Sequence, residues 1–155
     1  MRWGDNDAYG HVNNTVYYAW FDSTVNEWLV GQGLLDIAAG DPIGLVVETG
    51  CIFFSPLSFP GIIDVGLVVA HIGRSSVTYD LGVFAPGTDV PSAQGHFTHV
   101  YVDREGRRPM ALPTAWRTRI EASGQSRLGG VILPDKTCDI VGGGHDPIDN
   151  PNSLA

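Results

Sequence analysis

The chain has 155 residues, of which 43% are hydrophobic and 17% charged, and its formal net charge is -8 at pH 7. This length suits one domain with a buried core, and the composition is too apolar for a disordered chain. Because the nine basic residues include a single lysine, no basic patch is expected for nucleic acid or an anionic membrane, and neither is an expected partner.

The sequence also argues against a membrane span, a disulfide framework and a metal site. No window reaches the roughly 18 to 20 consecutive apolar residues that a span requires, and the first residues lack an apolar signal-peptide core. Cys51 and Cys138 are far apart and have no neighbours at metal-ligand spacing. We therefore expect a cytoplasmic protein with free thiols, no metal and no other cofactor.

The first predicted element is an amphipathic helix from about Thr15 to Leu29. Asn13 and Asn14 are good N-cap residues, and Gly31 and Gly33 mark its end. Spacings of three and four place its apolar residues on one side. These residues are Val16, Tyr17, Trp20, Phe21, Val25, Trp28 and Leu29.

Four strands are predicted after a turn at Gly40-Asp41-Pro42, where runs of β-branched and aromatic residues begin. They cover residues 43–55, 62–72, 75–84 and 93–102. The third has one largely apolar face. The second is apolar on both faces, which predicts a central strand with a helix on one side. A short turn at Gly73-Arg74 joins these two as antiparallel neighbours.

Together these elements predict an α+β architecture in which a long helix lies across an antiparallel sheet. Arg2-Trp3 would then be the stub of a truncated first strand. A helix-like or extended piece at Thr114 to Glu121 would end a folded domain that we place at residues 1–122. Residues 123–155 are rich in Gly, Pro, Asp and Asn without periodicity, which predicts a loose tail.

The loop directly before the helix carries the densest group of reactive side chains. It holds two carboxylates, Asp5 and Asp7, the imidazole of His11, and the amides of Asn13 and Asn14. Free N–H groups at a helix N-terminus can hold a developing oxyanion, so an acid group facing them would suit acyl transfer. An Asx-rich turn that only caps the helix explains the same residues equally well.

The order of these residues resembles a family signature. The loop is similar to the D-x-D-x-x-G-H-V-N-N-x-x-Y motif of the 4-hydroxybenzoyl-CoA thioesterase-like branch of the hotdog superfamily. The residues that match are Asp5-Asn6-Asp7-Ala8-Tyr9-Gly10-His11-Val12-Asn13-Asn14 and then Tyr17, followed in order by Ile52-Phe53-Phe54-Ser55-Pro56, Gly73-Arg74-Ser75-Ser76 and Val102-Asp103. The similarity covers residues 2 to about 117. It implies the hotdog fold, an antiparallel sheet wrapped around one long central helix.

The resemblance also implies roles for individual residues. Asp7 corresponds to the catalytic carboxylate, acting as nucleophile or general base, and burial is expected to tune it. The backbone N–H of Asn14 corresponds to the oxyanion donor. His11 matches a histidine given a catalytic part in related acyl-carrier-protein thioesterases, with stacking or loop hydrogen bonding as the alternative. Gly10 and Tyr17 are candidate substrate contacts, although Tyr17 also suits the core.

A second candidate contact with substrate lies at Arg74, Ser75 and Ser76. A guanidinium beside hydroxyl and backbone donors suits a phosphate, and related thioesterases use residues here for the CoA nucleotide. The alternative is an arginine lying over the sheet at a hairpin. The arginines of the turn after Val102 are interpreted as a solvated loop tip, with CoA contact as the lesser alternative.

Three other reactive residues are expected to be structural. Cys51 lacks a histidine partner and is interpreted as a small core residue. His96 and His99 have opposite facing parity on a strand, so they do not form a ligand pair.

The resemblance therefore implies an acyl-CoA thioesterase that hydrolyses its substrate to free acid and CoA. Its partners would be the acyl-CoA and further copies of the chain, in a homodimer or homotetramer whose sites form between subunits. A non-catalytic acyl-thioester binding module and an acyl-carrier-protein thioesterase are the alternatives. A dehydratase of the same superfamily fits less well, because the helix-start pattern is that of the thioesterases.

Overall fold

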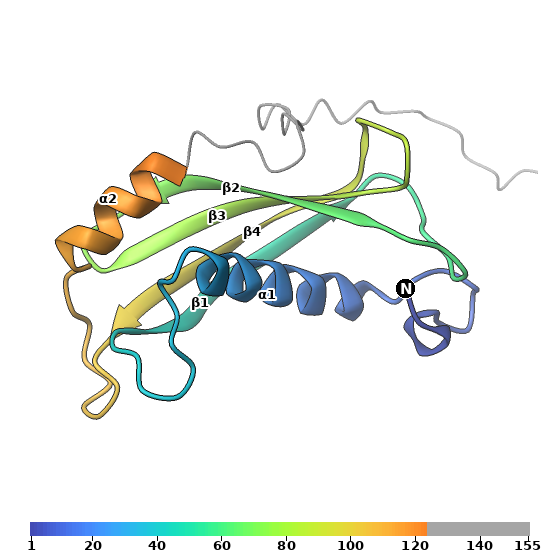
Figure 1. Cartoon of the computed structure of the whole chain (residues 1–155). Coiled ribbons are helices and arrows are strands. Elements are labelled where there is room, and N and C mark those ends of the chain that lie inside the picture. Colours follow the sequence, from blue (N-terminus) through green and yellow to red (C-terminus); the bar gives the residue numbers. More distant parts are fainter. Residues whose placement is uncertain (124–155) are drawn as a thin grey trace, which may run out of the picture.

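The computed structural model describes residues 1–123, which form two helices packed against one antiparallel sheet (Figure 1). The strand order across the sheet is β1-β4-β3-β2. The predicted loose tail lies outside the described residues, apart from Ser123. The elements in chain order are the 3-10 helix η1 (Trp3–Asp5), α1 (Asn14–Gly31), β1 (Ile43–Phe53), β2 (Asp64–Ile72), β3 (Ser76–Phe84), β4 (Pro91–Val102) and α2 (Thr114–Ser123).

The predicted helix is confirmed as α1, which lies lengthwise across one face of the sheet (Figure 1). Asn13 caps it, because the Asn13 Oδ1 atom accepts a hydrogen bond from the Thr15 N–H at 3.0 Å. Its buried residues recur every four positions and point into the core. They are Tyr17, Phe21, Val25 and Leu29.

The inner face of the sheet meets α1 closely at the middle of β4. Gly95 lies under the Phe21 ring, and a Cβ atom at this position would collide with the ring and with the Gly50 carbonyl oxygen. Beside this contact, the hydroxyls of Tyr79 and Tyr101 share a buried hydrogen bond of 2.9 Å. The predicted apolar face of β3 is confirmed, since Val77, Tyr79, Leu81 and Val83 are all fully buried.

Two predictions about the sheet are wrong. β2 is an edge strand, although its apolar residues on both faces suggested a central one. One face, with Val65, Leu67 and Val69, packs into the core, and Val68 on the other face is only half-buried. The apolar composition of β2 therefore reflects the burial of its side chains and not a central place in the strand order. Residues Trp3–Asp5 form a 3-10 helix, so Arg2-Trp3 is not a strand stub.

The remaining expectations differ only in their boundaries. β1 ends at Phe53 because the N–H groups of Phe54 and Ser55 both donate to the Ser92 carbonyl oxygen, which turns the chain away from the sheet. The segment after Pro113, left open between helix and extended chain, is the helix α2. Within residues 1–123, no helix has the length and apolar character to cross a membrane.

Candidate active site

The loop that carries the sequence signature folds back on itself as a small closed turn. Asn6 and Val12 form an isolated antiparallel bridge at its base. Inside the bridge, the Asp7 N–H donates to the His11 carbonyl at 2.7 Å, and the Gly10 N–H donates to the Asp7 carbonyl at 3.1 Å. Gly10 has φ +81°, a conformation that favours glycine. The glycine of the signature thus shapes the turn.

Asp7 is half-buried in this turn, and one of its carboxylate oxygens is held by backbone donors. The Oδ1 atom accepts hydrogen bonds from the N–H of Tyr9 at 2.8 Å and of His11 at 3.3 Å. Among residues 1–123 the other oxygen, Oδ2, has no hydrogen-bond partner. The carboxylate is therefore fixed in direction and has one oxygen available for chemistry.

The deeply buried carboxylate of the signature is Asp5, not Asp7. Asp5 is 2% exposed, and its Oδ1 atom lies 3.1 Å from Arg2 Nε and 3.0 Å from Arg2 Nη2. Burial raises the pKa of Asp5, but the hydrogen bonds and charge of Arg2 outweigh it and bring the pKa below its usual value. The Asp5 carbonyl also accepts the Asn13 N–H at 2.8 Å, which ties the turn to the helix cap. Asp5 is thus a structural anchor.

The N-terminus of α1 offers one backbone donor that the cap leaves unused. Asn13 Oδ1 accepts the Thr15 N–H, and the Asn13 carbonyl accepts the Val16 N–H at 2.9 Å. None of the hydrogen bonds among residues 1–123 uses the N–H of Asn14, the first residue of the helix. Such an amide can accept an anion at the positive end of the helix dipole. The side chain of Asn13 caps the helix, as predicted.

Asn6 fixes the turn to the rest of the molecule, a role that sequence analysis did not assign. Its Oδ1 atom accepts the Phe59 N–H at 3.0 Å, and its Nδ2 atom donates to the Gly10 carbonyl at 3.3 Å. Next to it, the Val12 N–H donates to the Leu57 carbonyl at 2.8 Å. In the sequence, the only sign of this role was the position of the amide side chain between Asp5 and Asp7.

The other residues of the signature play different parts. The imidazole of His11 is exposed, and within the described chain only its backbone forms hydrogen bonds. Tyr17 is 3% exposed, with its ring centroid 5.0 Å from those of both Trp20 and Phe53 in edge-to-face contacts. Burial raises the pKa of Tyr17, and nearby Cys51 adds to this. In the single chain Tyr17 is a core residue.

Arg74, Ser75 and Ser76 lie at the other end of the sheet from Asp7 (Figure 1). The Ser75 carbonyl accepts the N–H of Tyr101, near the end of β4, whereas Tyr17 packs at the opposite end of the strand. The chain therefore does not bring the two groups of predicted site residues together. Arg74 is exposed, as a phosphate contact requires.

The arginine-rich turn after β4 is held by its own aspartate. Asp103 accepts the N–H groups of Gly106 and Arg108, and the hydrogen bonds from Arg108 and then Gly106 hold its pKa below the usual value. Arg104 Nε donates to the Gly40 carbonyl at 2.8 Å, which clasps the loop between α1 and β1. Sequence analysis missed this clasp.

His99 is buried, and Cys51 is half-buried and packs against the core, in line with its predicted role as a small core residue. Burial raises the pKa of the Cys51 thiol to about 11, so it stays protonated at neutral pH. His99 is 2% exposed among aromatic rings, and in the described residues its Nδ1 atom has no hydrogen-bond partner. Burial lowers the pKa of His99 to about 4, against a smaller opposing effect of Asp22. His96 points to the other face, 3.5 Å from Glu48, which confirms the opposite parity.

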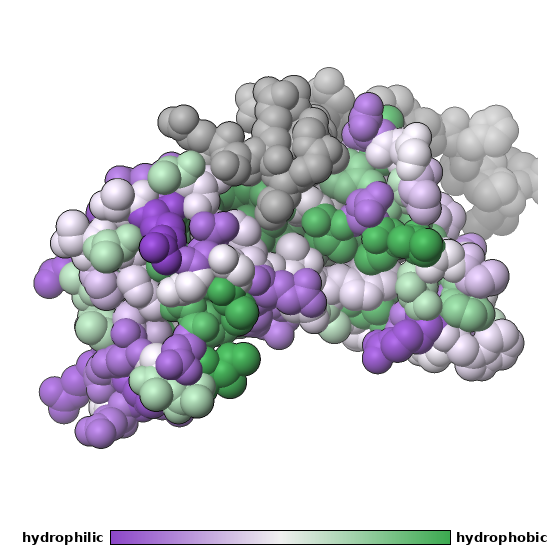
Figure 2. Space-filling model, in the orientation of Figure 1, coloured by the Kyte–Doolittle hydropathy of each residue, from purple (hydrophilic) through white to green (hydrophobic). Residues whose placement is uncertain are grey.

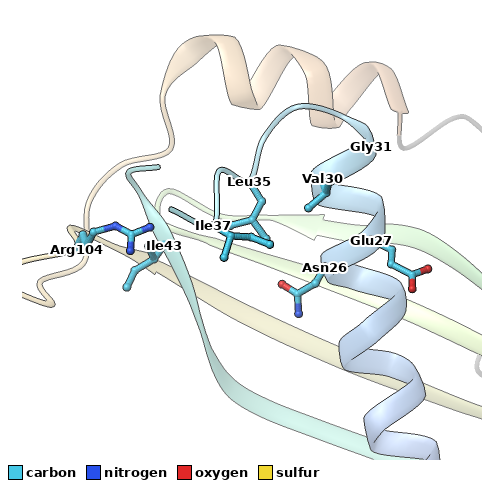
Figure 3. A pocket seen from close by; sticks show the side chains of 8 residues that line it. All are labelled: Asn26, Glu27, Val30, Gly31, Leu35, Ile37, Ile43 and Arg104. Atoms are coloured by element: carbon cyan, nitrogen blue, oxygen red, sulfur yellow. The ribbon is translucent and has the colours of Figure 1, made fainter. Parts of the chain in front are cut away.

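A groove of about 640 Å³ opens between the C-terminal half of α1 and the start of β1 (Figure 3). Its volume is in the range of small-molecule pockets. It is lined by Asn26, Glu27, Val30, Gly31, Leu35, Ile37, Ile43 and Arg104. Sequence analysis missed it, although two apolar residues outside the predicted helix face, Val30 and Ile37, were a possible signal.

Comparison with known proteins identifies the family. Residues 1–120 match the sequence profile described as the thioesterase-like superfamily. The chain belongs to this superfamily. It is thereby classed among the thioester hydrolases, and its helix and antiparallel sheet are those of the hotdog fold, as expected. No functionally curated protein matches the sequence.

Several solved structures resemble the chain over most of their length. The PA5185 protein of Pseudomonas aeruginosa strain PAO1 is 49% identical, with 79% of this chain and 85% of that chain covered and a TM-score of 0.75. PA2801, a putative thioesterase of Pseudomonas aeruginosa, is 26% identical, with 77% and 92% covered and a TM-score of 0.71. A Thermus thermophilus thioesterase in complex with coenzyme A and zinc is 28% identical, with 80% and 89% covered and a TM-score of 0.68.

Proposed function

We propose that the protein hydrolyses an acyl-CoA to the free acid and CoA, with Asp7 as the catalytic carboxylate. The observation that carries this proposal is the geometry of the turn. Backbone N–H groups hold Asp7 Oδ1 and leave Oδ2 available, and the turn leads directly into a helix whose first amide, on Asn14, is unused. A fixed carboxylate beside an oxyanion donor is what acyl transfer requires.

In the proposed reaction, the thioester carbonyl oxygen accepts the Asn14 N–H, which stabilises the negative charge that develops on it. As general base, Asp7 Oδ2 takes a proton from water while the water oxygen bonds to the carbonyl carbon. The carbon–sulfur bond then breaks, and the CoA thiolate takes the proton back from Asp7. As nucleophile, Oδ2 would itself bond to the carbonyl carbon and displace the CoA thiolate. Water would then hydrolyse the resulting mixed anhydride, which restores Asp7 and releases the proton that the thiolate takes up. His11 is a further candidate for proton transfer.

CoA is the proposed thiol carrier for two reasons. A 28% identical relative was solved with coenzyme A bound. In this chain the exposed Arg74, with Ser75 and Ser76 beside it, provides the donors that a phosphate needs in an otherwise acidic protein. We propose that Gly10 contributes by shaping the turn and Tyr17 by packing in the core beneath it. Neither is proposed to make a polar contact with the CoA nucleotide.

We also propose that the active form is a homodimer or a homotetramer built on pairing of β1. Among residues 1–123, β1 is an edge strand with one unpaired side. It also carries a run of apolar side chains that are 37% to 60% exposed, an arrangement that proteins normally protect from solvent. These are Leu45, Val46, Val47, Ile52, Phe53 and, just beyond the strand, Phe54. A second copy related by a twofold axis covers the edge on both chains at once.

The thiol carrier can be tested by competition. We expect thiol release from acyl-CoA substrates by the purified protein, and inhibition of this release by free CoA. Efficient hydrolysis of acyl-carrier-protein thioesters without any inhibition by CoA would favour the carrier-protein alternative. Binding of acyl-CoA without turnover by a folded oligomer would favour the non-catalytic binding module.

A further inference from the structure

The turn between β2 and β3 is held by the segment that contains the start of α2. Arg117, in the first turn of α2, donates a hydrogen bond from its Nη2 atom to the Gly73 carbonyl oxygen. The N–H of Leu112, just before α2, donates to the Arg74 carbonyl oxygen at 2.9 Å. Figure 1 shows α2 lying beside this turn. Two successive carbonyl groups of the turn therefore point toward the same segment, residues 112–117.

The N–H groups on the same two peptide units are unused. The Arg74 N–H shares a unit with the Gly73 carbonyl, and the Ser75 N–H shares one with the Arg74 carbonyl. Both units are trans, so each N–H points away from the segment that its carbonyl faces. No hydrogen bond within residues 1–123 uses either N–H group. Two adjacent N–H groups directed to one side form a concave site for an anion.

The side chains beside these N–H groups suit a phosphate. Arg74 is exposed, and the hydroxyls of Ser75 and Ser76 form no hydrogen bond within the described part of the chain. Guanidinium, hydroxyl and backbone N–H groups are all donors to phosphate oxygens. Figure 2 shows hydrophilic side chains over α2, which suits a charged ligand at this end of the molecule.

The guanidinium of Arg117 is held in place by the packing of α2. Ile120 is fully buried, and Trp116 packs against the core, so the helix is anchored on both sides of Arg117. Arg117 itself is half-buried. Without its hydrogen bond, the Gly73 carbonyl loses its partner, and the peptide unit that carries the Arg74 N–H is free to rotate.

From this arrangement we infer that Arg117 is a positioning residue for CoA binding. By holding the Gly73 carbonyl, it directs the N–H groups of Arg74 and Ser75 at a phosphate group of CoA. This role rests on the proposed function, because it presupposes CoA as the thiol carrier. The phosphate does not change during thioester hydrolysis, so its contacts stabilise the bound substrate and the transition state equally. Arg117 should therefore affect KM and not kcat.

Kinetics with two thioesters of the same acyl group test this role. Arg117→Met removes the donor and keeps a side chain of similar length. We expect its KM for the acyl-CoA, and its calorimetric Kd for free CoA, to rise about tenfold while kcat stays within about twofold. The acyl-pantetheine has no phosphate, so its kcat/KM should be unchanged. Equal losses on both substrates would show general damage to the fold and overturn the role of Arg117.

Arg119→Met is the matched control. Arg119 lies on the same helix but donates to the Gln32 carbonyl at the end of α1. This variant loses the same charge and leaves the turn intact, so we expect a wild-type KM for the acyl-CoA. An equal rise of KM in both variants would assign the effect to net charge and refute positioning by Arg117. Should Arg117→Met fail to fold, Arg117→Gln replaces it, with the same expected difference between the two substrates.

Failure of the proposed function would give a different result. A wild-type protein that neither hydrolyses acyl-CoA nor binds free CoA would refute the proposed function itself. An active wild type with an unchanged KM in Arg117→Met would refute only the role of Arg117.

Discussion

At the scale of single residues, the site depends on hydrogen bonds that give Asp7 one orientation. Asp5, buried and paired with Arg2, anchors the start of the turn, and Asn6 ties the base of the turn to the segment before β2. The sequence signature identified this loop, but the role of Asn6 depends on Phe59, 53 residues away in the chain. A contact between residues so far apart leaves no local pattern in the sequence, so the role of Asn6 could not be predicted.

Asn6→Ala is expected to lower kcat about tenfold with little change in KM, because the turn loses its contacts with Phe59 and Gly10 while the binding surface remains. The free energy of unfolding should fall by about 1 kcal/mol. Steady-state kinetics and chemical denaturation measure both. Thr88→Ala, which removes a hydrogen bond in a distant loop, should leave kcat unchanged. A proportional rise of KM alone would show that Asn6 does not position Asp7.

His99 predicts a stability loss at mildly acidic pH. Its pKa is about 4 in the folded chain and 6.5 ordinarily, so the unfolded chain binds the proton first as pH falls. Stability is therefore lost between about pH 6.5 and 4, amounting to about 2 kcal/mol between pH 7.5 and 5. Denaturation of wild type and His99→Phe at both pH values measures this. An unchanged pH dependence in His99→Phe would exclude His99 as its source.

At the scale of the elements, the hydrophobic pattern of the sequence predicted α1 and the four strands, but not the order in which the strands pair. α1 and the four strands follow from periodicity, since that signal is local. The order of the strands depends on which edges meet, and the apolar run of β2 could not report it. The contact of Arg104 with Gly40 escaped prediction for the same reason, because it joins residues 64 positions apart. The groove depends on how the end of α1, the following loop and the start of β1 pack together, which periodicity does not report.

The contact of α1 with β4 predicts that Gly95→Ala costs about 2 kcal/mol or more in unfolding free energy, because the new Cβ collides with Phe21 and backbone. Gly66→Ala on β2 is the matched control, since its Cβ would make an ordinary contact of 3.5 Å with Phe84. Chemical denaturation should show little loss for that variant. Equal losses in both would mean that backbone effects, and not the Phe21 contact, set the cost.

At the scale of the whole molecule, the two ends of each chain hold different parts of the proposed site. Asp7 and Asn14 lie at the N-terminal end of α1, and Arg74 lies in the turn between β2 and β3, at the other end of the sheet. A dimer joined through β1 would bring opposite ends of two chains together. The signature at one end of the chain predicted an active carboxylate, and the resemblance implied sites between subunits, but the sequence alone does not identify the residues of a second copy that would complete them.

Val47→Lys is expected to weaken dimerisation about tenfold or more, because it places a charge at an exposed position of the edge strand β1. Activity should fall with the dimer fraction. Analytical ultracentrifugation over a concentration series measures the change. Val90→Lys, at a more exposed valine in the loop before β4, should remain dimeric. A Val47→Lys protein with the wild-type dissociation constant would contradict pairing through β1.

Thiol release from a panel of aliphatic and aromatic acyl-CoAs, by wild-type protein and Asp7→Asn of the same oligomeric size, tests the role of Asp7 most directly. We predict turnover by the wild type and a loss of about a hundredfold or more in the variant, because Asp7 is the proposed base or nucleophile and the turn holds its carboxylate in one orientation. Equal rates in the two proteins would contradict this prediction and assign the chemistry to another residue.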